Sequence, residues 1–383
     1  MPNIAFFSNQ FARKNSTGVG RYAHNLMRGF KQLVTAPQVF PVATWSDMDR
    51  DSLNTFKSTT GLRLLPTGRW LTPFLWMSVG FPKIEQLLNF YVDIVHACDL
   101  GIQVATSKPY VVTIHDIGPL IHPEYFPKES YWVMQKNLAY AIKKAAAFIC
   151  VSRATADSLL EYIQRRNAVD LSSRTYVAHE GVTEQFLQAP DFSILDQDEH
   201  FNFTHQPFIL AVGKISPRKN LEVVIRALER LRSRIPHHLV TVGGDGWDFQ
   251  GVKNLVSSLG LVDRVHFVGY VSDEQLHALY AKATLFIFPS LFEGFGLTIL
   301  EAMASGCPVV TSNISSLPEV AGDAALLVDP TKIEEVASAM ETICQNDDLA
   351  NELKQKGGER ARQFSWKNCA KETLAIYTSL ISW

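Results

Sequence analysis

One stretch of this chain, Glu293 to Val310, constrains its fold more than any other. An apolar run, Leu285 to Phe288, precedes it and has the length and composition of a buried strand. Glu293 to Gly296 follows as a glycine-bearing loop, Leu297 to Ala304 has helical composition, and Val309-Val310 begins another strand. The order strand, loop, helix, strand is typical of a parallel sheet wound with helices.

The loop and the helix start carry groups suited to a charged and hydroxylated ligand. A helix N-terminus beside a glycine loop favours phosphate or another anion, because its backbone N–H groups point outward. We expect the N–H groups around Phe295, Gly296 and Leu297 to form part of such a cradle. Glu293 and Glu301 would repel an anion, so we interpret them as acceptors for sugar hydroxyls.

A second anion-binding pattern lies upstream. Phe208 to Val212 is predicted to be a strand, Gly213 begins the turn after it, and a helix is expected from Leu221. Arg218 and Lys219 stand side by side just before that helix. Two adjacent cations after a glycine turn suit a diphosphate.

The sequence E-G-F-G-L-T-I-L-E-A-M-A-S-G-C-P-V-V contains both acids, Glu293 and Glu301. Together with its flanking residues it resembles the signature of the retaining GT-B glycosyltransferases of the large family 4 type. The resemblance covers essentially the whole chain and is most specific from Gly213 to Val310. It implies an α/β, GT-B fold in which two doubly wound Rossmann-like domains face each other across a cleft. The alternation of predicted strands and helices also favours two doubly wound sheets.

The resemblance implies a role for each candidate in the second half of the chain. Arg218 and Lys219 would bind the donor pyrophosphate and stabilise the charge that develops on the leaving group, in place of a metal. Glu301 would accept hydrogen bonds from the ribose, and Glu293 from the transferred sugar. Further donor contacts are implied at Gly213, at Phe295, Gly296 and Leu297 and, near the nucleobase, at Tyr270 and Val271.

A glycine pair follows the first predicted strand. Gly18 and Gly20 formally fit the G-x-G-x-x-A dinucleotide fingerprint, which would suit a dehydrogenase. The context argues against that enzyme class, because about ten residues separate the strand Ile4–Phe7 from Gly18 where the dinucleotide turn is tight. The resemblance implies instead that Gly18 and Gly20 close on the donor diphosphate, before a helix from Tyr22 to Leu33.

His115 and Asp116 end the strand predicted over Tyr110 to Ile114. A residue at the carboxyl end of a parallel strand points toward the ligand crevice. The resemblance implies that His115 lies at the catalytic centre, with Asp116 orienting its ring or holding the loop; a satisfied core histidine is the alternative. His179 and Glu180 depart from the Asn-Gly-Val that such proteins commonly carry, and the sequence leaves their contacts open.

Two Asp-x-Asp matches test whether a metal is needed. Asp47-Met48-Asp49 and Asp196-Gln197-Asp198 both lie in polar segments, without the strand-end placement and supporting ligands of a metal site. We interpret both as solvated loops. We therefore expect no metal and no cofactor, the nucleotide sugar being a substrate.

The segment Arg69 to Met77 combines aromatic residues with a basic edge. One reading is a lip that touches a lipid-linked acceptor or the membrane interface. The other is the start of a core helix with Pro73 in its first turn. The sequence does not decide between them.

The charge and the composition of the chain bear on its binding partners and its localisation. The net charge of −2 gives no sign of nucleic-acid binding. Residues 1–190 carry 19 Lys and Arg against 14 Asp and Glu, which suits either an anionic membrane surface or scattered solvated charge. The five cysteines are scattered, without the spacing of disulfide pairs or of metal ligands, which is typical of a reduced, cytosolic protein. The start of the chain lacks a signal-peptide pattern. The apolar stretch from Trp70 to Pro82 is too short to span a bilayer. We expect a cytoplasmic protein, free or peripheral on the inner face of the cytoplasmic membrane.

The predicted domains are an acceptor-side Rossmann-like domain over residues 1–190 and a nucleotide-sugar domain over residues 207–365. Residues 188–206 are polar and aperiodic and are predicted to be the linker. A last helix within residues 366–383 is expected to cross back onto the first domain, as the resemblance implies.

These expectations combine into one function. The chain is predicted to be a retaining, metal-independent hexosyltransferase, similar to bacterial mannosyltransferases of O-antigen and exopolysaccharide assembly. The first choice of donor is GDP-mannose, and the acceptor is expected to be lipid-linked or a saccharide. UDP-glucose, UDP-GlcNAc and dTDP-rhamnose stay open as donors. Rival classes are a glycosidase, a dehydrogenase and a non-catalytic nucleotide-sugar-binding protein, and the complete set of Arg218, Lys219, Glu293 and Glu301 argues against the last.

Overall fold

The structure, a computed structural model, describes residues 1–13, 18–65, 68–167, 169–197, 199–246 and 249–381. The chain divides into two compact units. Unit 1 comprises Met1–Gly181 and Ser365–Trp383, and unit 2 comprises Val182–Phe364. The chain therefore passes from one unit to the other at two points, after Gly181 and after Phe364.

The linker expected over residues 188–206 lies inside unit 2 instead. Short helices form there, α8 over Ser193–Asp196 and the 3-10 helix η5 over Glu199–His205. Leu195 and Phe201 are buried and anchor the segment. The polar composition of this segment suggested a free linker because its two apolar anchors stand apart among polar residues.

In the described part of unit 1, seven parallel strands form one sheet in the order β3-β2-β1-β4-β5-β6-β7. The strand order reverses between β1 and β4. Parallel sheets bind ligands at such a switch point, outside the carboxyl ends of the strands. The strands are β1 Asn3–Phe7, β2 Gln38–Ala43, β3 Arg63–Leu64, β4 Ile94–Ala97, β5 Tyr110–Ile114, β6 Ala147–Cys150 and β7 Thr175–Val177.

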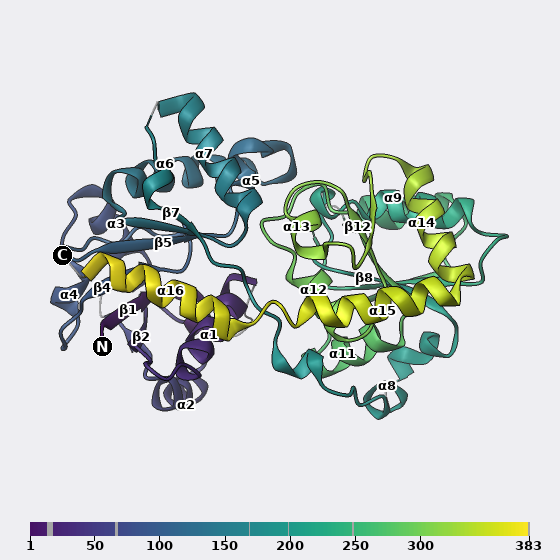
Figure 1. The fold of residues 1–383 in the computed structure, drawn as a ribbon, viewed down its shortest axis with the longest axis horizontal. Coiled ribbons are helices and arrows are strands. Elements are labelled where there is room, and N and C mark those ends of the chain that lie inside the picture. The colour runs from purple at the N-terminus through teal and green to yellow at the C-terminus, as the bar shows by residue number, and fades with distance from the viewer. Residues whose placement is uncertain (14–17, 66–67, 168, 198, 247–248, 382–383) are drawn as a thin grey trace. The chain divides into compact units, whose positions relative to one another are not determined.

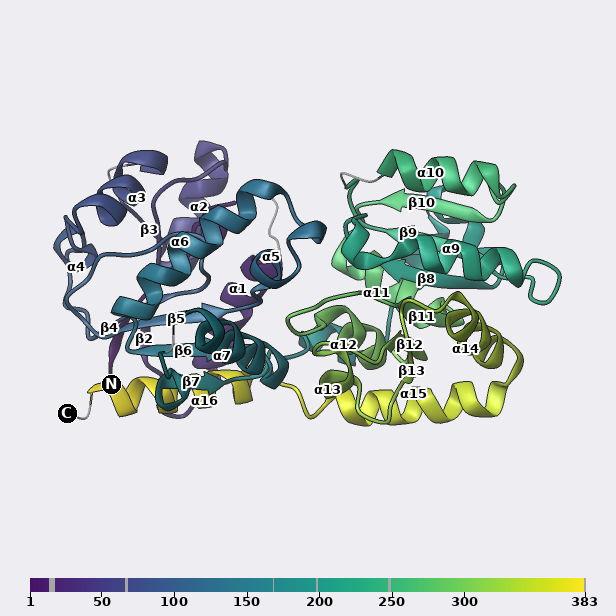
Figure 2. The ribbon, with the colours of Figure 1, turned by 90° about the horizontal axis from the view of Figure 1, so that it is seen from above.

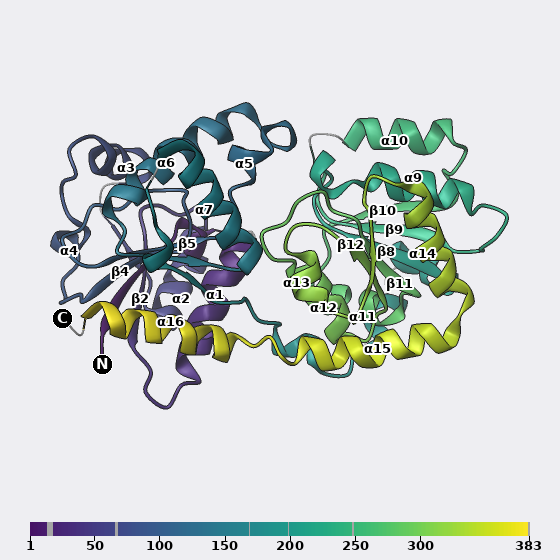
Figure 3. The same cartoon turned by 45° about the horizontal axis from the view of Figure 1, so that its top comes forward.

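Helices cover both faces of this sheet (Figure 1). On one face, α1 (Gly18–Lys31) lies beside the C-terminal helix α16 (Trp366–Ile381), and Gly29 permits their approach because a Cβ there would collide with the Trp366 carbonyl. On the other face lie α6 and α7, as Figure 3 also shows. The remaining helices are α2 Arg50–Thr60, α3 Gly68–Ser78, α4 Ile84–Leu87, α5 Gly118–Ile121, α6 Lys128–Lys144, α7 Arg153–Asn167 and the 3-10 helices η1 Asn9–Ala12, η2 Pro123–Tyr125 and η3 Ser172–Arg174.

Unit 2 repeats the same plan. Its described residues form a six-stranded parallel sheet in the order β10-β9-β8-β11-β12-β13, so the switch point lies between β8 and β11. The strands are β8 Phe208–Val212, β9 His238–Val242, β10 Val265–Gly269, β11 Leu285–Phe288, β12 Val309–Ser312 and β13 Leu326–Val328.

The helices of unit 2 also form two layers. Helices α9 and α14 pack together on one face of the sheet, whereas α12 packs against α11 and α15 on the other (Figures 1 and 2). The bounds are η4 Glu184–Leu187, η6 Pro217–Lys219, α9 Leu221–Arg230, α10 Phe249–Ser258, α11 Asp273–Lys282, α12 Leu297–Ala304, α13 Leu317–Ala321, α14 Ile333–Gln345 and α15 Asp347–Ala361.

Burial of apolar strands fixes both sheets. Every residue of β5 and of β11 is buried, as strands covered on both faces must be. Burying one such aliphatic or aromatic side chain stabilises the fold by about 1.5–3 kcal/mol. Within the described residues, none of the helices is both long enough and apolar enough to cross a bilayer.

Candidate functional site

The switch point of unit 2 brings together two segments that are far apart in the sequence. The chain leaves β8 through Gly213, whose φ of 141° favours glycine. It then forms the 3-10 helix η6, which carries Arg218 and Lys219. Asn220 ends η6 in the left-handed conformation, and its side chain donates to the carbonyl oxygen of Pro289, just past the end of β11. The two strand ends are thereby tied to each other.

Glu293 meets both cations through a single oxygen. Its Oε1 lies 2.5 Å from Nη1 of Arg218 and 2.7 Å from Nζ of Lys219. The hydroxyl of Ser290 donates to the same oxygen at 2.6 Å. Lys219 also sits 4.2 Å above the ring of Phe288, a cation–π contact. We call Arg218, Lys219 and Glu293 the ionic cluster.

The electrostatics of the ionic cluster favour a charged carboxylate. Burial alone would raise the pKa of Glu293, but Lys219 and then Arg218 outweigh it and lower that pKa from 4.5 to about 2. The side chains of all three residues are largely buried. The cluster therefore keeps a surplus of one positive charge beside the carboxyl ends of β8 and β11, which can attract an anion.

The loop from Glu293 to Gly296 is held in place by the two serines that precede α13. Ser315 donates to the carbonyl oxygen of Glu293 at 2.5 Å, and Ser316 donates to that of Phe295 at 2.7 Å. Gly296 has φ 120°, and a Cβ there would lie 2.9 Å from the side chain of Leu317. This geometry fixes where α12 begins, with Leu297 as its first residue.

The other candidates of unit 2 differ in exposure. Glu301 lies on α12 with 3% of its surface exposed. Tyr270, just past β10, is 79% exposed, whereas its neighbour Val271 is buried. The structure thus joins Arg218, Lys219 and Glu293 directly, and Gly213 lies beside Lys219. Neither Tyr270 nor Val271 forms a hydrogen bond or an ion pair with the ionic cluster in the part of the chain that the structure describes.

His115 follows β5 in unit 1 and is hydrogen-bonded through both ring nitrogens. Nδ1 lies 3.2 Å from Oε1 of the buried Glu180, and Nε2 lies 2.9 Å from the carbonyl oxygen of Cys98. Both partners accept, so the ring that makes both bonds carries both protons. Burial lowers the pKa of His115, but Glu180 and the charge of Asp99 outweigh it and raise that pKa above 6.5.

This contact settles what Glu180 touches, which the sequence left open. Glu180 orients the ring, and Asp116 holds the loop, since its Oδ1 accepts from the backbone N–H of Gly118 at 2.8 Å. The edge of the Tyr22 ring packs against His115 with centroids 4.7 Å apart. The two hydrogen bonds and the packed ring of Tyr22 therefore fix the orientation of the His115 ring.

The glycine pair lies in a different local structure from the one expected. Gly18 and Gly20 belong to the first turn of α1, which begins at Gly18 rather than at Tyr22. Glycine is a poor helix former, and the apolar face of Tyr22, Leu26 and Phe30 overrides that preference by burial. Ser16 and Thr17 lie outside the described residues. Gly18 and Gly20 belong to unit 1, whereas the other donor candidates belong to unit 2.

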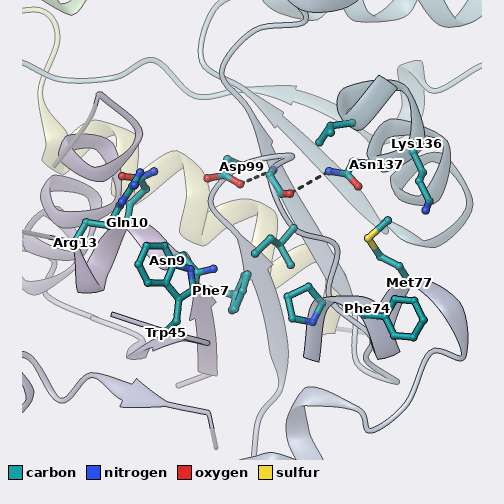
Figure 4. A pocket seen from close by; sticks show the side chains of 14 residues that line it. Phe7, Asn9, Gln10, Arg13, Trp45, Phe74, Met77, Asp99, Lys136 and Asn137 are labelled. Atoms are coloured by element: carbon teal, nitrogen blue, oxygen red, sulfur yellow. Dashed lines mark hydrogen bonds between the residues drawn. The ribbon is translucent and has the colours of Figure 1, made fainter. Parts of the chain in front are cut away.

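A cavity of about 560 Å³ opens at the switch point of unit 1 (Figure 4). It is lined from η1 by Asn9 and Arg13 and, just after β4, by Asp99. Helix α3 contributes Phe74, whose side chain lies on the opposite side of the cavity in Figure 4. The sequence drew no attention to Asp99, although its place two residues after an apolar strand is a usable signal.

The segment Arg69 to Met77 forms most of α3, and Pro73 lies in the middle of that helix rather than in its first turn. Pro73, Phe74 and Met77 line the cavity. Leu71 and Phe74 are more than half exposed. The side chains of Arg69 and Trp70 lie outside the described part of the structure.

Of the Asp-x-Asp matches, the first has a structural role. Asp49 caps α2, accepting from the backbone N–H of Ser52 at 2.9 Å, and Asp47 lies 3.6 Å from Arg13. In the second match, Asp196 lies 3.9 Å from Lys282, and Asp198 lies outside the described residues.

Comparison with known families matches both halves of the chain. Residues 194–362 match the family model described as glycosyl transferases group 1, and residues 16–182 match that of glycosyltransferase family 4. O-antigen chain mannosyltransferase B of Escherichia coli is 33% identical over 278 residues, which are 70% of each chain. The O-antigen chain mannosyltransferase RfbU of Salmonella typhimurium is 28% identical and covers 73% of each chain.

Longer relatives match only in part. The serotype-specific mannosyltransferase WbdA of Escherichia coli is 30% identical over 312 residues, which are 78% of this chain but 37% of that protein. Among solved structures, Anabaena HepE in complex with UDP and glucose superposes with a TM-score of 0.76 at 18% identity, covering 99% of this chain and 100% of that one. WaaG, a glycosyltransferase involved in lipopolysaccharide biosynthesis, gives 0.69 at 17% identity and covers 98% and 99%. These neighbours show the GT-B fold.

Proposed function

The chain belongs to the family 4, group 1 glycosyltransferases, and from that premise we propose that it transfers mannose from GDP-mannose to a lipid-linked or saccharide acceptor. The product would be a bacterial cell-surface polysaccharide of the O-antigen or exopolysaccharide kind. Support for the sugar comes from the names of the relatives, which are O-antigen mannosyltransferases in two species.

The observation that carries the proposal is the ionic cluster at the switch point of unit 2. A nucleoside diphosphate leaves with negative charge on its terminal phosphate, and fixed cations stabilise such charge most when they are partly shielded from water. Arg218 and Lys219 are held in that state by Glu293. An arriving diphosphate would share these cations with Glu293 and use the surplus positive charge of the cluster.

We propose that transfer proceeds with retention of configuration, as the resemblance to the retaining GT-B glycosyltransferases implies. In the proposed step, the bond between the anomeric carbon and the phosphate oxygen breaks while the acceptor hydroxyl attacks from the same face. The proton of that hydroxyl passes to the departing phosphate, so the donor supplies the base. Arg218 and Lys219 stabilise the phosphate during this exchange, and Glu293 accepts a hydrogen bond from a hydroxyl of the transferred sugar.

The remaining donor contacts are proposed on the same basis. The N–H groups at Phe295, Gly296 and Leu297 would complete the cradle at the start of α12. Glu301 would accept from the ribose, and Tyr270 and Val271 would border the nucleobase. In unit 1, His115 and Asp116 would border the transferred sugar, and Gly18 and Gly20 would approach the diphosphate.

We propose that no metal takes part, because two protein cations stand where a metal would neutralise the diphosphate. The test is a rate assay in EDTA, followed by addition of Mg²⁺ or Mn²⁺. Full activity in EDTA is expected. A rate that vanishes in EDTA and returns with either ion would contradict metal independence.

UDP-glucose has specific support as an alternative donor. The structure of HepE in complex with UDP-glucose superposes on this chain with a TM-score of 0.75. The experiment that tests the proposed function measures release of nucleoside diphosphate from GDP-mannose, UDP-glucose, UDP-GlcNAc and dTDP-rhamnose, with and without a mannoside acceptor. We expect GDP-mannose to turn over fastest. Binding without turnover of any of them would instead favour a non-catalytic nucleotide-sugar-binding protein.

We also propose cytoplasmic placement with peripheral contact to the inner face of the membrane. The exposed apolar side chains Leu71, Phe74, Val79 and Phe81, on α3 and just after it, support this contact. Co-sedimentation with vesicles of phosphatidylglycerol, compared with phosphatidylcholine, tests it. The same amount of protein in the supernatant with phosphatidylglycerol vesicles, with phosphatidylcholine vesicles and without lipid would contradict membrane contact.

A further inference from the structure

Arg360 lies in the last turn of α15, outside the ionic cluster, and holds the end of another helix. Its Nε donates to the carbonyl oxygen of Val320 at 2.9 Å, and its Nη2 donates to that of Glu319 at 2.6 Å. Both carbonyls belong to the last turn of α13, where the carbonyl oxygens of a helix have no partner within it. Arg360 therefore supplies the donors that the carboxyl end of α13 lacks.

The other end of α13 holds the loop of Glu293. Ser316 directly precedes α13, and its Oγ lies 2.7 Å from the carbonyl oxygen of Phe295 and 2.9 Å from that of Glu293. Leu317, the first residue of α13, is buried and packs against Gly296, where a Cβ would lie 2.9 Å from the leucine side chain. Since α13 has only five residues, a shift at its carboxyl end would also move its amino end.

A second set of contacts leads from Arg360 to the same loop. Cζ of Arg360 lies 4.9 Å from the ring centroid of Phe364, a cation–π contact. The ring of Phe364 meets the ring of Phe295 with 5.8 Å between centroids and 70° between planes. Both phenylalanines are buried. Phe295 is thus held at its carbonyl through α13 and at its ring through Phe364, and Arg360 supports both.

The partners of Arg360 are suited to fixing geometry. They are two backbone carbonyls, the side-chain amide oxygen of Gln363 at 2.8 Å and an aromatic ring, and all four are neutral. A guanidinium presents its N–H groups in one plane with fixed directions, so it sets the mutual position of the groups that accept from it. Gly322, just after α13, has a φ of 57°, and a Cβ there would lie 3.2 Å from Nε of Arg360. The chain therefore approaches the guanidinium closely where α13 ends.

The position of Phe295 matters because both of its neighbouring segments belong to the proposed diphosphate site. On one side is Glu293, which contacts Arg218 and Lys219, and on the other side is the start of α12. The N–H groups of a helix N-terminus bind an anion only when they point toward it. A misplacement of about 1 Å can lower a rate by about 10². A residue that fixes Phe295 therefore acts on both parts of the site.

We propose that Arg360 is a positioning residue for the transfer reaction, and that it fixes Phe295 through α13 and through Phe364. The inference rests on the proposed function of the ionic cluster. It adds a residue that contacts neither donor nor acceptor and yet sets the affinity for the diphosphate and the rate of transfer.

The test compares two variants with a matched control. Arg360→Met keeps an unbranched apolar side chain but removes the donors, and Phe364→Leu removes the ring between Arg360 and Phe295. Arg264→Met is the control, because Arg264 also donates to three backbone carbonyl oxygens of unit 2. Those contacts lie near the amino ends of β9 and β10, whereas the ionic cluster lies near carboxyl ends of strands.

Calorimetry measures the affinity for GDP and for UDP, and initial rates with GDP-mannose and UDP-glucose give kcat and KM. All are measured at a temperature at which thermal unfolding shows each protein to be folded. Arg360→Met and Phe364→Leu should bind the nucleotide that wild type prefers about tenfold more weakly and should lower kcat about tenfold or more. Arg264→Met should keep the wild-type affinity and kcat, although it too loses hydrogen bonds to the backbone.

Wild-type affinity and kcat in either Arg360→Met or Phe364→Leu would overturn the proposal. An equal loss in Arg264→Met would also overturn it, since the effect would then be one of general stability. Failure of the proposed function would look different, because wild type itself would turn over neither nucleotide sugar, whatever the variants bind.

Discussion

Nζ of Lys219 lies 2.7 Å from Oε1 of Glu293, and this contact joins the segment after β8 to the segment after β11. Arg218 reaches the same oxygen. One carboxylate thus holds two cations at the edge of a parallel sheet where ligands bind. The contacts of Glu293 with Arg218 and Lys219 explain why a carboxylate lies beside two cations in a site predicted to bind an anion. Glu293 keeps the cations in place and leaves one positive charge unbalanced.

The first prediction concerns the two cations. Arg218→Ala or Lys219→Ala should each lower turnover by about 10²–10³, the usual effect of removing one stabiliser of transition-state charge. Folding should persist, because the remaining cation still pairs with Glu293. Lys253→Ala is the control, since Lys253 also lies 4.2 Å from a phenylalanine ring, that of Phe249, but outside the cluster. If Arg218→Ala or Lys219→Ala turned over at the wild-type rate, the proposal that these cations bind the donor diphosphate would be wrong.

The second prediction uses the pKa of Glu293, lowered from 4.5 to about 2. Because the pKa of Glu293 is lower in the folded state, its ionisation stabilises the fold by about 3 kcal/mol when the pH is above the unfolded-state pKa of 4.5. That contribution is lost as the pH falls toward 2. The difference in unfolding free energy between wild type and Glu293→Gln should therefore shrink from pH 4.5 downward. Chemical denaturation across this range measures it. Glu222→Gln, at an exposed ion pair, should change stability by less than about 1 kcal/mol at any pH. A pH-independent difference for Glu293→Gln would contradict the prediction.

The third prediction separates the two glutamates of the loop and helix. Glu301→Gln should weaken the binding of both free nucleoside diphosphate and donor, by tenfold or more, if its carboxylate accepts from the ribose. Glu293→Gln keeps both cations, so it should not weaken the binding of free nucleotide, and it should lower kcat with the full donor. Calorimetry with free nucleotide, beside initial rates, distinguishes these effects. The opposite pattern would mean that the two roles are reversed.

The fourth prediction concerns the contact of His115 with Glu180. The raised pKa of His115 stabilises the folded state fully below pH 6.5, and that contribution is lost as the pH rises through the folded value. In Glu180→Gln the effect of burial dominates, and the pKa of His115 should fall below 6.5. Titration of the ring by NMR measures this shift directly.

The matched control for that variant is Glu124→Gln, which removes a carboxylate 3.3 Å from the exposed His122. It should leave the unfolding free energy within about 1 kcal/mol of wild type. An unchanged pKa of His115 in Glu180→Gln would show that the 3.2 Å contact does not govern its protonation.

The fifth prediction concerns Gly296. Alanine there would be strained at φ 120° and would press on Leu317, so Gly296→Ala should destabilise the protein by about 1–3 kcal/mol. Gly18→Ala is the control for stability, because a Cβ at that helical position meets nothing within 4 Å. Thermal unfolding of both variants checks the difference. Equal stability would mean that the start of α12 adapts to a side chain.

Local signals predicted much of the fold. The strands Phe208–Val212 and Leu285–Phe288 and the helix Leu297–Ala304 are confirmed to the residue. Each is a short apolar or helical run bounded by glycine, proline or a polar loop, so neighbours in sequence decide it. The prediction that this helix begins at Tyr22 was wrong, because burial of the apolar face of α1 extends the helix to Gly18 despite the low helix propensity of glycine.

Contacts between distant segments were harder to predict. The resemblance named Arg218, Lys219 and Glu293, but their meeting at a single oxygen depends on how β8 and β11 are paired. Glu180 and His115 are 65 positions apart in the sequence, so no local sequence pattern predicts their contact. Ser315 and Ser316, which hold the loop of Glu293, precede a helix and look like ordinary capping residues in the sequence.

The central claim is that the ionic cluster binds the diphosphate of a nucleotide sugar, and one titration tests it most directly. GDP, UDP, dTDP and ADP are titrated by calorimetry into wild type, Lys219→Ala and Lys253→Ala, without added metal. The account predicts that wild type and Lys253→Ala bind the same nucleoside diphosphate with equal affinity and that Lys219→Ala binds it at least tenfold more weakly. Equal affinity in wild type and Lys219→Ala, or no binding of any of the four by wild type, would contradict it.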